Sequence, residues 1–428
     1  MKKIAVIGSG AREHALVRAL IRGAAQSADR EPREVIAIPG NPGIAREARC
    51  IASGSTVQQL AEATVRERPD LAVVGPEAPL AAGLADLLAE AGIACFGPSA
   101  AAAQIEASKS FAKEVMRAAG VPTAASESFD DHARARAYAA SRGACVVKLD
   151  GLAAGKGVIV CSSSDEAARA VDELWQLGAL QGAALKLVIE EKLSGNEISV
   201  IAFSDGERLL LLPPARDHKR LYDFDRGPNT GGMGAVSPPR QATEALLDEV
   251  LQTVLRPTVH ELKRRGTPFR GALFAGLMLT PAGVRVLEFN CRLGDPEAQA
   301  ILMRVTSDVL PLFEACAAGS LAGLSLAIDP RPSIALVLAS HGYPAHPRPG
   351  DLIEGLEASD LLHATDLAVF HAGTRQSGSS VVTAGGRVLT LCALGGDVSE
   401  ARARAYKLAE QVTFPGRQLR GDIGAADL

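Results

Sequence analysis

A glycine-rich turn between two runs of β-branched residues constrains the fold of this chain most strongly. Residues 146–160 read VVKLDGLAAGKGVIV. A Walker A loop needs the pattern G-x4-G-K-[ST] between a strand and a helix, whereas here three residues separate Gly151 from Gly155, and Gly157 follows Lys156. The VIV run that comes next predicts a second strand. The segment therefore predicts an antiparallel hairpin, whose turn is either an ordinary flexible loop or a cover for a triphosphate bound by backbone N–H groups.

Short apolar runs alternate with Ala- and Leu-rich helical segments near the start of the chain. The runs are KIAVIG, EVIAI, LAVVG and GIACFG, and this alternation is typical of a parallel α/β sheet. After the first run, Gly8 and Gly10 match a dinucleotide fingerprint, but Glu13 stands at the position of the third glycine. A side chain there hinders close packing of helix on strand, which argues against NAD. Phosphate binding by the N-terminus of the helix stays open.

Charge and apolar patterning argue against two classes of partner. Lys and Arg number 45 and Asp and Glu number 49, so the net charge of −4 offers no basic surface for nucleic acid. No apolar run reaches the roughly 18 residues that a membrane span needs. Seven cysteines lie far apart without a CxxC pair, which favours reduced thiols and a cytoplasmic protein.

The rest of the chain predicts two further α/β units. SKSFAKEVMRAAG predicts a helix that ends at Gly120, and the strands of the hairpin are followed by a helix and by the strand ALKLVIEEKL. Leu221–Pro239 is rich in Gly, Pro, Asn and Asp and predicts a long loop with a functional role or high mobility. ALFAGLML and VRVLEFN predict strands, residues 327–333 a linker, and SIALVLAS, LAVFHAGT and RVLTLCALGG a last mixed unit.

Polar groups at the ends of two apolar strands suit a nucleotide with a metal. Glu288 and Asn290 are spaced i and i+2, so both side chains point from one face of their strand. Two hard oxygen donors suit Mg²⁺, which completes its shell with phosphate and water; the alternative is a polar face that meets solvent. In VIEEKLSGNE, Glu190–Leu193 fit a hinge strand beside adenine and Glu197 fits the ribose, although such charges often mark a solvated strand end.

The order of these motifs along the chain is informative. SKSFAK, KLDGLAAGKGVIV, IEEKLSGNE, DHKR, GPNTGGMGA and EFNCRLGDPE together resemble an ATP-grasp ligase. With GSGAREHAL, PGNPG, VGPEAPL and FGPS before them, and FHAGT and GGRVL near the end, nearly the whole chain is similar to the glycinamide ribonucleotide synthetase family. The resemblance implies an α/β protein with a parallel α/β (pre-ATP-grasp) domain at residues 1–106, an ATP-grasp domain at 107–329 with a small lid subdomain at about 122–194, and a mixed α/β domain at 330–428.

The resemblance also implies an ATP site and a metal site. The residues that it assigns to ATP are Lys109, Lys148, Gly151, Gly155, Lys156, Gly157, Glu190, Glu191, Leu193 and Glu197. It assigns Mg²⁺, or Mn²⁺, to Glu288 and Asn290. Many ATP-grasp enzymes carry another metal carboxylate on the preceding strand, where this chain has Gly276.

The implied reaction joins glycine to 5-phosphoribosylamine through a glycyl phosphate, which gives glycinamide ribonucleotide, ADP and phosphate for purine biosynthesis. The implied catalytic residues are Arg292, Lys148 and Asp217. The implied substrate contacts are Gly10, Ala11, Asn41, Glu77, Asp217, Lys219, Arg220, Arg292 and Asp295, with Ala11 standing where the family more often has Gly. Because water would hydrolyse an acyl phosphate, a closing lid is expected at residues 151–157 or 227–234.

Two other hypotheses stay open at this point. An ATP-grasp enzyme could act on another substrate, although DHKR with GPNTGGMG argues against it. A nucleotide-binding regulatory module without turnover is the other, and the complete set of lysines and acidic residues argues against it. Small molecules are the expected partners, and a monomer is compatible with the sequence. His14 and His371 are expected to be structural rather than metal ligands.

Overall fold

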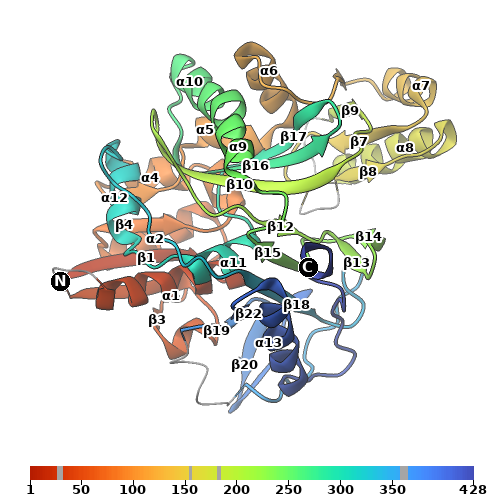
Figure 1. Cartoon of the computed structure of the whole chain (residues 1–428). Coiled ribbons are helices and arrows are strands. Elements are labelled where there is room, and N and C mark those ends of the chain that lie inside the picture. Colours follow the sequence, from red (N-terminus) through yellow and green to blue (C-terminus); the bar gives the residue numbers. More distant parts are fainter. Residues whose placement is uncertain (27–31, 154–156, 181–184, 357–364) are drawn as a thin grey trace.

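The computed structural model of the chain describes residues 1–26, 32–153, 157–180, 185–356 and 365–428 (Figure 1). Within these ranges the strands form four larger sheets and two hairpin-like pairs. Figure 1 shows the sheet of β1 and the sheet of β18 side by side, with the β10–β16–β17 sheet above them and the α7–α8 unit projecting to one side. No helix among the described residues is long and apolar enough to span a membrane.

The first sheet is parallel throughout, in the order β3-β2-β1-β4-β5. The four apolar runs near the start of the chain form β1, β2, β4 and β5, so the predicted parallel α/β sheet is confirmed. The elements of this part are β1 (Lys2–Gly8), α1 (Ala11–Gln26), β2 (Arg33–Pro39), β3 (Arg49–Cys50), α2 (Val57–Glu67), β4 (Leu71–Val74), α3 (Glu77–Ala81), α4 (Leu84–Glu90), β5 (Ala94–Phe96) and α5 (Ala100–Ala107).

A small unit with its own apolar core contains the predicted hairpin. Its sheet has the order β6-β9-β7-β8, and β7 and β8 pair antiparallel with Val146 opposite Val160, which confirms the hairpin. Residues 154–156 of the turn, with the predicted sites Gly155 and Lys156, lie outside the described residues. The elements of this unit are β6 (Ser126–Phe129), α7 (His132–Arg142), β7 (Cys145–Leu149), β8 (Val158–Val160), α8 (Ser164–Leu180) and β9 (Leu187–Glu191). Helix α6 (Lys109–Ala119), which comes before them in the chain, packs on α5 instead.

The second antiparallel sheet carries the candidate metal residues. Its order is β11-β10-β16-β17, and long strands β10 and β16 pair along their whole lengths. The apolar runs predicted as strands are β16 and β17, as expected. The elements around this sheet are β10 (Asn196–Asp205), β11 (Leu209–Leu211), α9 (Glu244–Val250), a π-helix (Leu251–Leu255), α10 (Arg256–Arg264), β16 (Arg270–Thr280), β17 (Gly283–Asn290), α11 (Glu297–Arg304) and α12 (Leu310–Ala318).

The last sheet draws its strands from two distant parts of the chain, in the order β12-β15-β18-β22-β19. Strand β15 pairs antiparallel with β18, with Ala235 opposite Ala335. A sheet therefore crosses the proposed boundary at residue 330, and the domain limits remain a proposal. The elements are β12 (Arg216–Asp217), β15 (Gly234–Ser237), β18 (Ser333–Ala339), β19 (Leu367–His371), β20 (Thr374–Ser377), β21 (Ser380–Thr383), β22 (Arg387–Leu394) and α13 (Val398–Gln411).

The prediction of a loop at Leu221–Pro239 was wrong. The segment contains most of β13 (Arg220–Tyr222), β14 (Arg226–Asn229) and β15. Its Gly and Pro content hides these strands, because main-chain pairing can override local propensity. β13 and β14 pair with each other, and β15 pairs with the distant β18. Thr230 also donates from its N and its Oγ1 to the Lys219 carbonyl, each at 2.8 Å. Pairing and hydrogen bonds thus hold the part at 227–234 in this structure, and a lid there stays a prediction.

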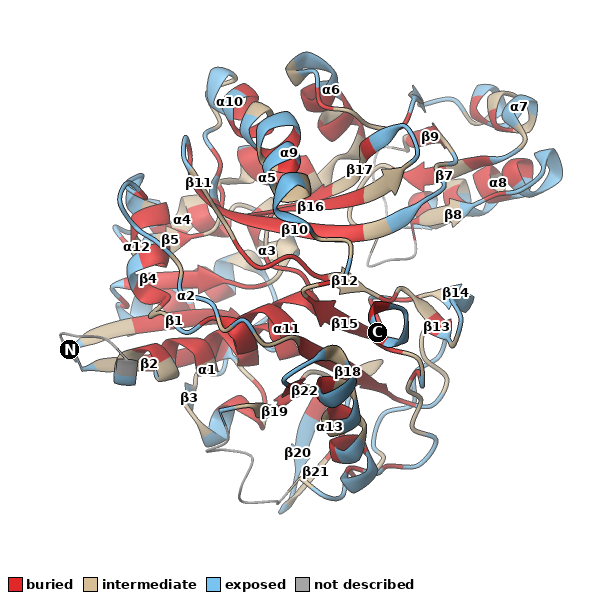
Figure 2. Ribbon diagram, in the orientation of Figure 1, coloured by how far each residue is buried: buried red, intermediate tan, exposed pale blue. Residues whose placement is uncertain are grey.

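Buried aromatic rings join the first sheet to the β10 sheet. Figure 2 shows the middle of β10 and strand β4 as buried. The rings of Phe96 and Phe203 meet edge to face at 5.4 Å, and Phe313 of α12 packs on both, with centroids at 4.3 Å from Phe96 and 5.5 Å from Phe203. These rings belong to a core cluster shared by all the larger units except the small hairpin unit. All seven cysteines are free in the structure.

Replacing Phe203 tests how much this contact contributes to stability. Phe203 has no exposed surface, so Phe203→Ala leaves a cavity and removes two ring contacts. We expect it to lower the free energy of unfolding by about 3–5 kcal/mol, measured by urea denaturation. Phe224→Ala is the control, because Phe224 is 77% exposed, and its effect is expected within about 0.5 kcal/mol. Equal losses in both variants would show that the Phe203 cluster contributes no special stability.

Candidate active site

The end of β17 places two oxygen donors on one face of its sheet. Gly276 lies opposite Glu288, and Phe274 lies opposite Asn290. Within the described ranges, neither Glu288 nor Asn290 makes a side-chain hydrogen bond or an ion pair, although Asn290 is buried. A Cβ at Gly276 would come within 3.3 Å of the Glu288 Cγ, so the glycine leaves room beside that carboxylate.

Three lysines from different elements keep Glu288 ionised. Burial disfavours its charge, yet Lys219, Lys148 and Lys109 outweigh burial and lower its pKa. Lys109 is the first residue of α6 and Lys148 lies on β7, so the structure brings the two predicted phosphate lysines to the predicted metal carboxylate. The carboxylate of this group can bind a cation, and its three ammonium groups can bind the negative oxygens of a ligand.

Lys148 also forms a buried ion pair that the sequence did not reveal. Its Nζ lies 3.0 Å from Glu190 Oε2, and Lys113 Nζ lies 3.2 Å from Glu190 Oε1. The exposed fractions are 9% for the Lys148 side chain, 6% for Lys113 and 3% for Glu190. Lys148 Nζ donates in addition to the Leu287 carbonyl at 3.0 Å. Glu190 thus holds Lys148 against the strand that carries Glu288.

The start of the glycine-rich turn is tied to the N-terminus of α6. Lys109 Nζ donates to the Gly151 carbonyl at 2.8 Å. Asp150 accepts from the Ser110 Oγ at 2.5 Å and from the Ser110 N at 3.2 Å. At the other end of the turn, Leu149 N donates to the Gly157 carbonyl at 2.8 Å. These bonds fix both ends of the turn beside the lysines.

A second group of charges surrounds Lys219. Its Nζ lies 2.7 Å from Glu197 Oε2, and the carboxylates of Glu197, Asp217 and Glu288 raise its pKa although the surrounding protein opposes its charge. Burial raises the pKa of Asp217 to about 8, with Glu297 and the other carboxylates adding to this rise and Lys219 opposing it. The structure therefore brings Asp217, Lys219, Glu197 and Glu288 together.

Three further predicted residues lie on β13, on β9 and just after β9. Arg220 donates to the Gly227 carbonyl within the β13–β14 hairpin at 2.8 Å, so its described contact points away from the group around Lys219. Glu191 accepts from the Ala125 N at 2.9 Å, which leaves it in the sheet of the small unit. Leu193 follows β9 and is half-buried.

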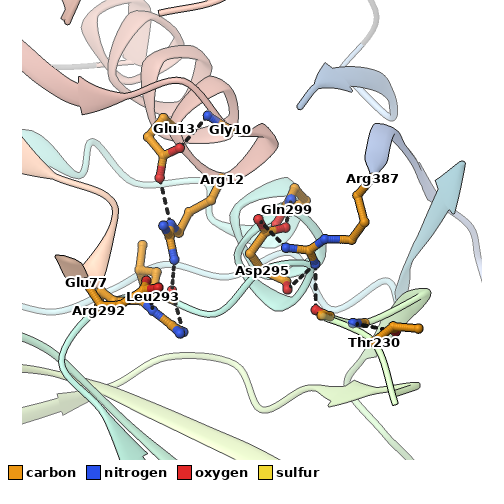
Figure 3. Close-up of polar contacts among 12 residues, drawn as sticks. Gly10, Arg12, Glu13, Glu77, Thr230, Arg292, Leu293, Asp295, Gln299 and Arg387 are labelled. Carbon is orange, nitrogen blue, oxygen red and sulfur yellow. Dashed lines mark hydrogen bonds and ion pairs between the residues drawn. The ribbon is translucent and has the colours of Figure 1, made fainter. Parts of the chain in front are cut away.

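Arg292, in the loop after β17, is held between two carboxylates. Its Nε lies 3.1 Å from Glu77 Oε2, and its Nη2 lies 2.8 Å from Glu106 Oε1. Glu106 Oε2 also accepts from the Cys291 N at 2.7 Å. Although burial opposes its charge, Glu77 keeps a low pKa of about 2 because Arg292 and Arg12 are near. The predicted contact pair Glu77 and Arg292 is therefore an ion pair (Figure 3).

The N-terminus of α1 differs from the predicted phosphate site. The Gly10 amide donates to Glu13 Oε2 at 2.6 Å, and Arg12 Nε donates to Glu13 Oε1 at 2.7 Å (Figure 3). A carboxylate that already occupies this amide opposes a phosphate at the same place. Ala11 begins the helix and is absent from the positive-φ residues, so its methyl group causes no strain.

Asn41 is saturated by hydrogen bonds within the protein. Its Nδ2 donates to the carbonyls of Ser9 and His371 at 2.9 and 2.8 Å. Its Oδ1 accepts from the amides of Gly43 and Ile44, each at 2.9 Å. This buried amide joins the end of β1 to β19, and a substrate contact would have to replace one of these bonds.

Asp295 is held by two residues that come after it in the chain. Gln299 Nε2 donates to Asp295 Oδ1 at 2.7 Å, and Arg387 Nη2 lies 3.0 Å from Asp295 Oδ2. Burial opposes its charge, but Arg387 and Arg12 lower its pKa. Figure 3 shows Asp295 between Gln299 and Arg387, on the side of the loop away from Glu77.

Sequence reasoning missed several charged residues of this site. They are Arg12, Glu106, Lys113 and Arg387. Glu106 gave one usable signal, since it is a carboxylate in an otherwise apolar helix. Arg12 and Arg387 lie inside GSGAREHAL and GGRVL, but the Leu293 and Asp295 carbonyls to which they donate are 281 and 92 residues away in the chain.

Comparison with known proteins agrees with this architecture. The chain matches three models of phosphoribosylglycinamide synthetase: the N domain over residues 2–106, the ATP-grasp (A) domain over residues 107–298 and the C domain over residues 333–426. A phosphoribosylamine–glycine ligase from Streptomyces coelicolor is 49% identical, covering 99% of this chain and 99% of its own.

Solved structures agree as well. The crystal structure of a phosphoribosylamine–glycine ligase from Thermotoga maritima has a TM-score of 0.84 at 33% identity, covering 98% of this chain and 100% of that chain. The biotin carboxylase domain of a Hydrogenobacter thermophilus 2-oxoglutarate carboxylase, crystallised with MgADP, has a TM-score of 0.72 at 17% identity, covering 98% and 91%. The predicted ATP-grasp fold is confirmed.

The buried His371 makes stability depend on pH. Burial lowers its pKa to about 3, and His14 adds to this effect. As pH falls below about 6.5, the unfolded imidazole binds a proton that the folded one does not, so the free energy of unfolding decreases toward pH 3. His371→Asn is expected to reduce the slope between pH 6 and 4.5 by up to about 1.4 kcal/mol per pH unit. Urea denaturation across this range measures it, and parallel curves for both proteins would contradict it.

Glu106 is expected to set the position of Arg292. Glu106→Gln leaves one oxygen for two donors, so either Arg292 or the Cys291 amide loses its acceptor. We expect the ATP-dependent turnover number to fall on the order of 10- to 100-fold, as one unsatisfied buried donor costs about 1–3 kcal/mol. Glu261→Gln is the matched control, because Glu261 also binds two arginines, Arg264 and Arg265, but lies on α10. Equal turnover in the two variants would exclude this role.

Proposed function

The chain belongs to the phosphoribosylglycinamide synthetase family, and we propose that it uses ATP to join glycine to 5-phosphoribosylamine. The products are glycinamide ribonucleotide, ADP and phosphate, and the step belongs to purine biosynthesis. The chain is thus a carbon–nitrogen bond-forming ligase. The observation that carries this proposal is the ionised Glu288 beside three lysines, in a chain that matches all three domains of the family.

Lys109 and Lys148 are proposed to neutralise the phosphates of ATP. Both lie beside Glu288, and Lys109 also contacts the start of the glycine-rich turn. The turn residues Gly151 and Gly157, with Gly155 and Lys156 outside the described ranges, would cover the phosphates. Glu190, Glu191 and Leu193 would border adenine, and Glu197 would accept from the ribose hydroxyls.

The donors at the end of β17 fit a divalent metal that is shared with the nucleotide. Glu288 and Asn290 supply one ionised and one neutral oxygen ligand, and neither is used by another described residue. No group of three or more His, Cys, Asp or Glu side chains in the described ranges could hold a metal alone, which suits a cation that takes its other ligands from phosphates and water. When bound, such a metal draws negative charge from the phosphate oxygens. Mg²⁺, or Mn²⁺ in its place, is our proposal.

The first step brings two anions together. An oxygen of the glycine carboxylate attacks the γ-phosphorus, the bond to the β-phosphate oxygen breaks, and ADP leaves. Lys109, Lys148 and Lys219 offset the repulsion between the two anions and the charge that spreads over the transferred group. The product of this step is glycyl phosphate.

In the second step the amine of phosphoribosylamine attacks the glycyl carbon. Phosphate leaves with the electron pair of the anhydride bond, and the amine loses a proton. Arg292 is proposed to orient the acyl phosphate, and Asp217, Lys219 and Asp295 to border the amine side. Gly10, Ala11, Asn41 and Glu77 remain proposed contacts of phosphoribosylamine, with the Gly10 amide and the Asn41 side chain already bonded to the protein.

The enzyme acts on small molecules, and we propose that it works in the cytoplasm and needs no protein partner for activity. A monomer is compatible with this proposal. The biotin carboxylase fold gives the main alternative, an ATP-grasp enzyme that activates a different acid.

The direct test is release of phosphate from ATP. We expect release only when glycine and phosphoribosylamine are both present, the latter generated from ribose 5-phosphate and ammonia, with glycinamide ribonucleotide identified by mass spectrometry. Release with bicarbonate or formate instead would favour the alternative enzyme. Nucleotide binding without release would leave a regulatory module.

Glu288→Ala supplies the matched inactive variant. Removing this carboxylate leaves Lys109, Lys148 and Lys219 without their shared counter-charge and removes the ionised metal ligand. Turnover is expected to fall by at least about 1000-fold, while the circular dichroism spectrum stays that of the parent protein. Near-normal activity with Mg²⁺ would refute the metal assignment.

A further inference from the structure

Arg387 binds two active-site loops from the far end of the chain. It is the first residue of β22, and its Nη1 donates to the carbonyls of Gly231 and Asp295, each at 2.6 Å. Its Nη2 lies 3.0 Å from Asp295 Oδ2. Figure 3 shows the guanidinium reaching the Asp295 loop on one side and the segment of Thr230 on the other.

Glycines make this close contact possible. A Cβ at Gly231 would lie 3.1 Å from the Arg387 Cζ, and a Cβ at Gly232 would lie 2.6 Å from the Pro296 Cδ. Gly232 also has φ of 107°, which disfavours any other residue. The two loops therefore touch through their main chains, with the Arg387 guanidinium joining them.

The described hydrogen bonds of Asp295 and Gly231 hold both residues in one position. Both carboxylate oxygens of Asp295 are bonded, one to Gln299 and one to Arg387. The Gly231 amide donates to the Tyr343 hydroxyl at 2.9 Å. Without Arg387, the Gly231 carbonyl, the Asp295 carbonyl and one Asp295 carboxylate oxygen would lose a charge-assisted bond.

The side chain of Arg387 does not hold its own sheet together. Strand β22 pairs through its main chain with β18 on one side and β19 on the other. The three side-chain bonds of Arg387 all reach Gly231 and Asp295, which lie outside β18, β19 and β22. Loss of the guanidinium is therefore expected to loosen the loops more than the fold.

We propose that Arg387 is a positioning residue that brings the C-terminal sheet into the reaction by fixing Asp295 and the Gly231 segment on the phosphoribosylamine side. This inference rests on the proposed function. The proposed phosphate lysines, Lys109 and Lys148, contact neither of these loops. A change at Arg387 is therefore expected to leave the ATP side of the site intact.

The test compares Arg387→Met and Arg387→Lys with the parent enzyme. We expect Arg387→Met to lower kcat/KM for phosphoribosylamine on the order of 100-fold, because loss of positioning by about 1 Å has that effect. The KM for ATP is expected to stay within about threefold of the parent value. Arg387→Lys keeps the charge without the planar fork and is expected to recover part of the loss.

Arg404→Met is the matched control. Like Arg387, Arg404 binds main-chain oxygen and a carboxylate: it donates to the Leu394 carbonyl and to Asp366 Oδ2. It makes one carbonyl contact fewer than Arg387 and lies on α13. We expect this variant to lose thermal stability comparably and to keep kcat/KM within about twofold of the parent value. A similar kinetic loss in both variants, or equal rises in the KM values of all substrates, would overturn the positioning role.

Two further outcomes are decisive. If Arg387→Met does not fold, Gly231→Ala decides, because its Cβ would lie 3.1 Å from the Arg387 Cζ and push the guanidinium by a few tenths of an ångström, while φ of Gly231 is outside the positive range. A smaller loss with the same selectivity supports the role, and unchanged kinetics overturn it. If the parent enzyme itself forms no glycinamide ribonucleotide, the proposed function fails. Activity in the parent with no selective loss in the variants overturns only the role of Arg387.

Discussion

The arrangement on which this molecule depends is one carboxylate among three ammonium groups. Glu288, Lys109, Lys148 and Lys219 come from β17, from α6, from β7 and from the segment after β12, and each would be costly to bury alone. Together the lysines outweigh the effect of burial on Glu288 and lower the pKa of its carboxyl group. Such preorganised charge is what a reaction between two anions needs, because it is in place before the reactants arrive.

The rest of the fold holds the loop after β17 in a fixed position beside these four charged groups. That loop is fixed by Glu77 and Glu106 through Arg292, by Arg12 through the Leu293 carbonyl at 3.1 Å, and by Arg387 through Asp295. The partners belong to the first sheet and its helices and to the C-terminal sheet. Charged side chains from all three parts of the family's architecture therefore meet at this one short loop.

Local sequence patterns predicted many of the strands and part of the candidate site. β-Branched runs located β1, β7, β8 and β17, and the i, i+2 spacing put Glu288 and Asn290 on one face. What failed depended on partners that the pattern of residue types does not reveal. The strands in Leu221–Pro239 form through main-chain pairing that composition does not reveal, Glu13 takes the Gly10 amide, and Lys113 finds Glu190 only after two elements pack. The resemblance to a family supplied the roles, but the sequence could not show which side chains hold the assigned residues in place.

The central claim is that β17 presents a metal and a nucleotide to the lysines. A crystal structure with ADP and Mn²⁺, in which anomalous scattering identifies the metal, tests it most directly. The account predicts one cation bonded to a Glu288 carboxylate oxygen and to the Asn290 amide oxygen at about 2.2 Å, with phosphate oxygens between that cation and Lys109 and Lys148. A cation bound elsewhere, with Glu288 and Asn290 both uncoordinated beside ordered ADP, would contradict it.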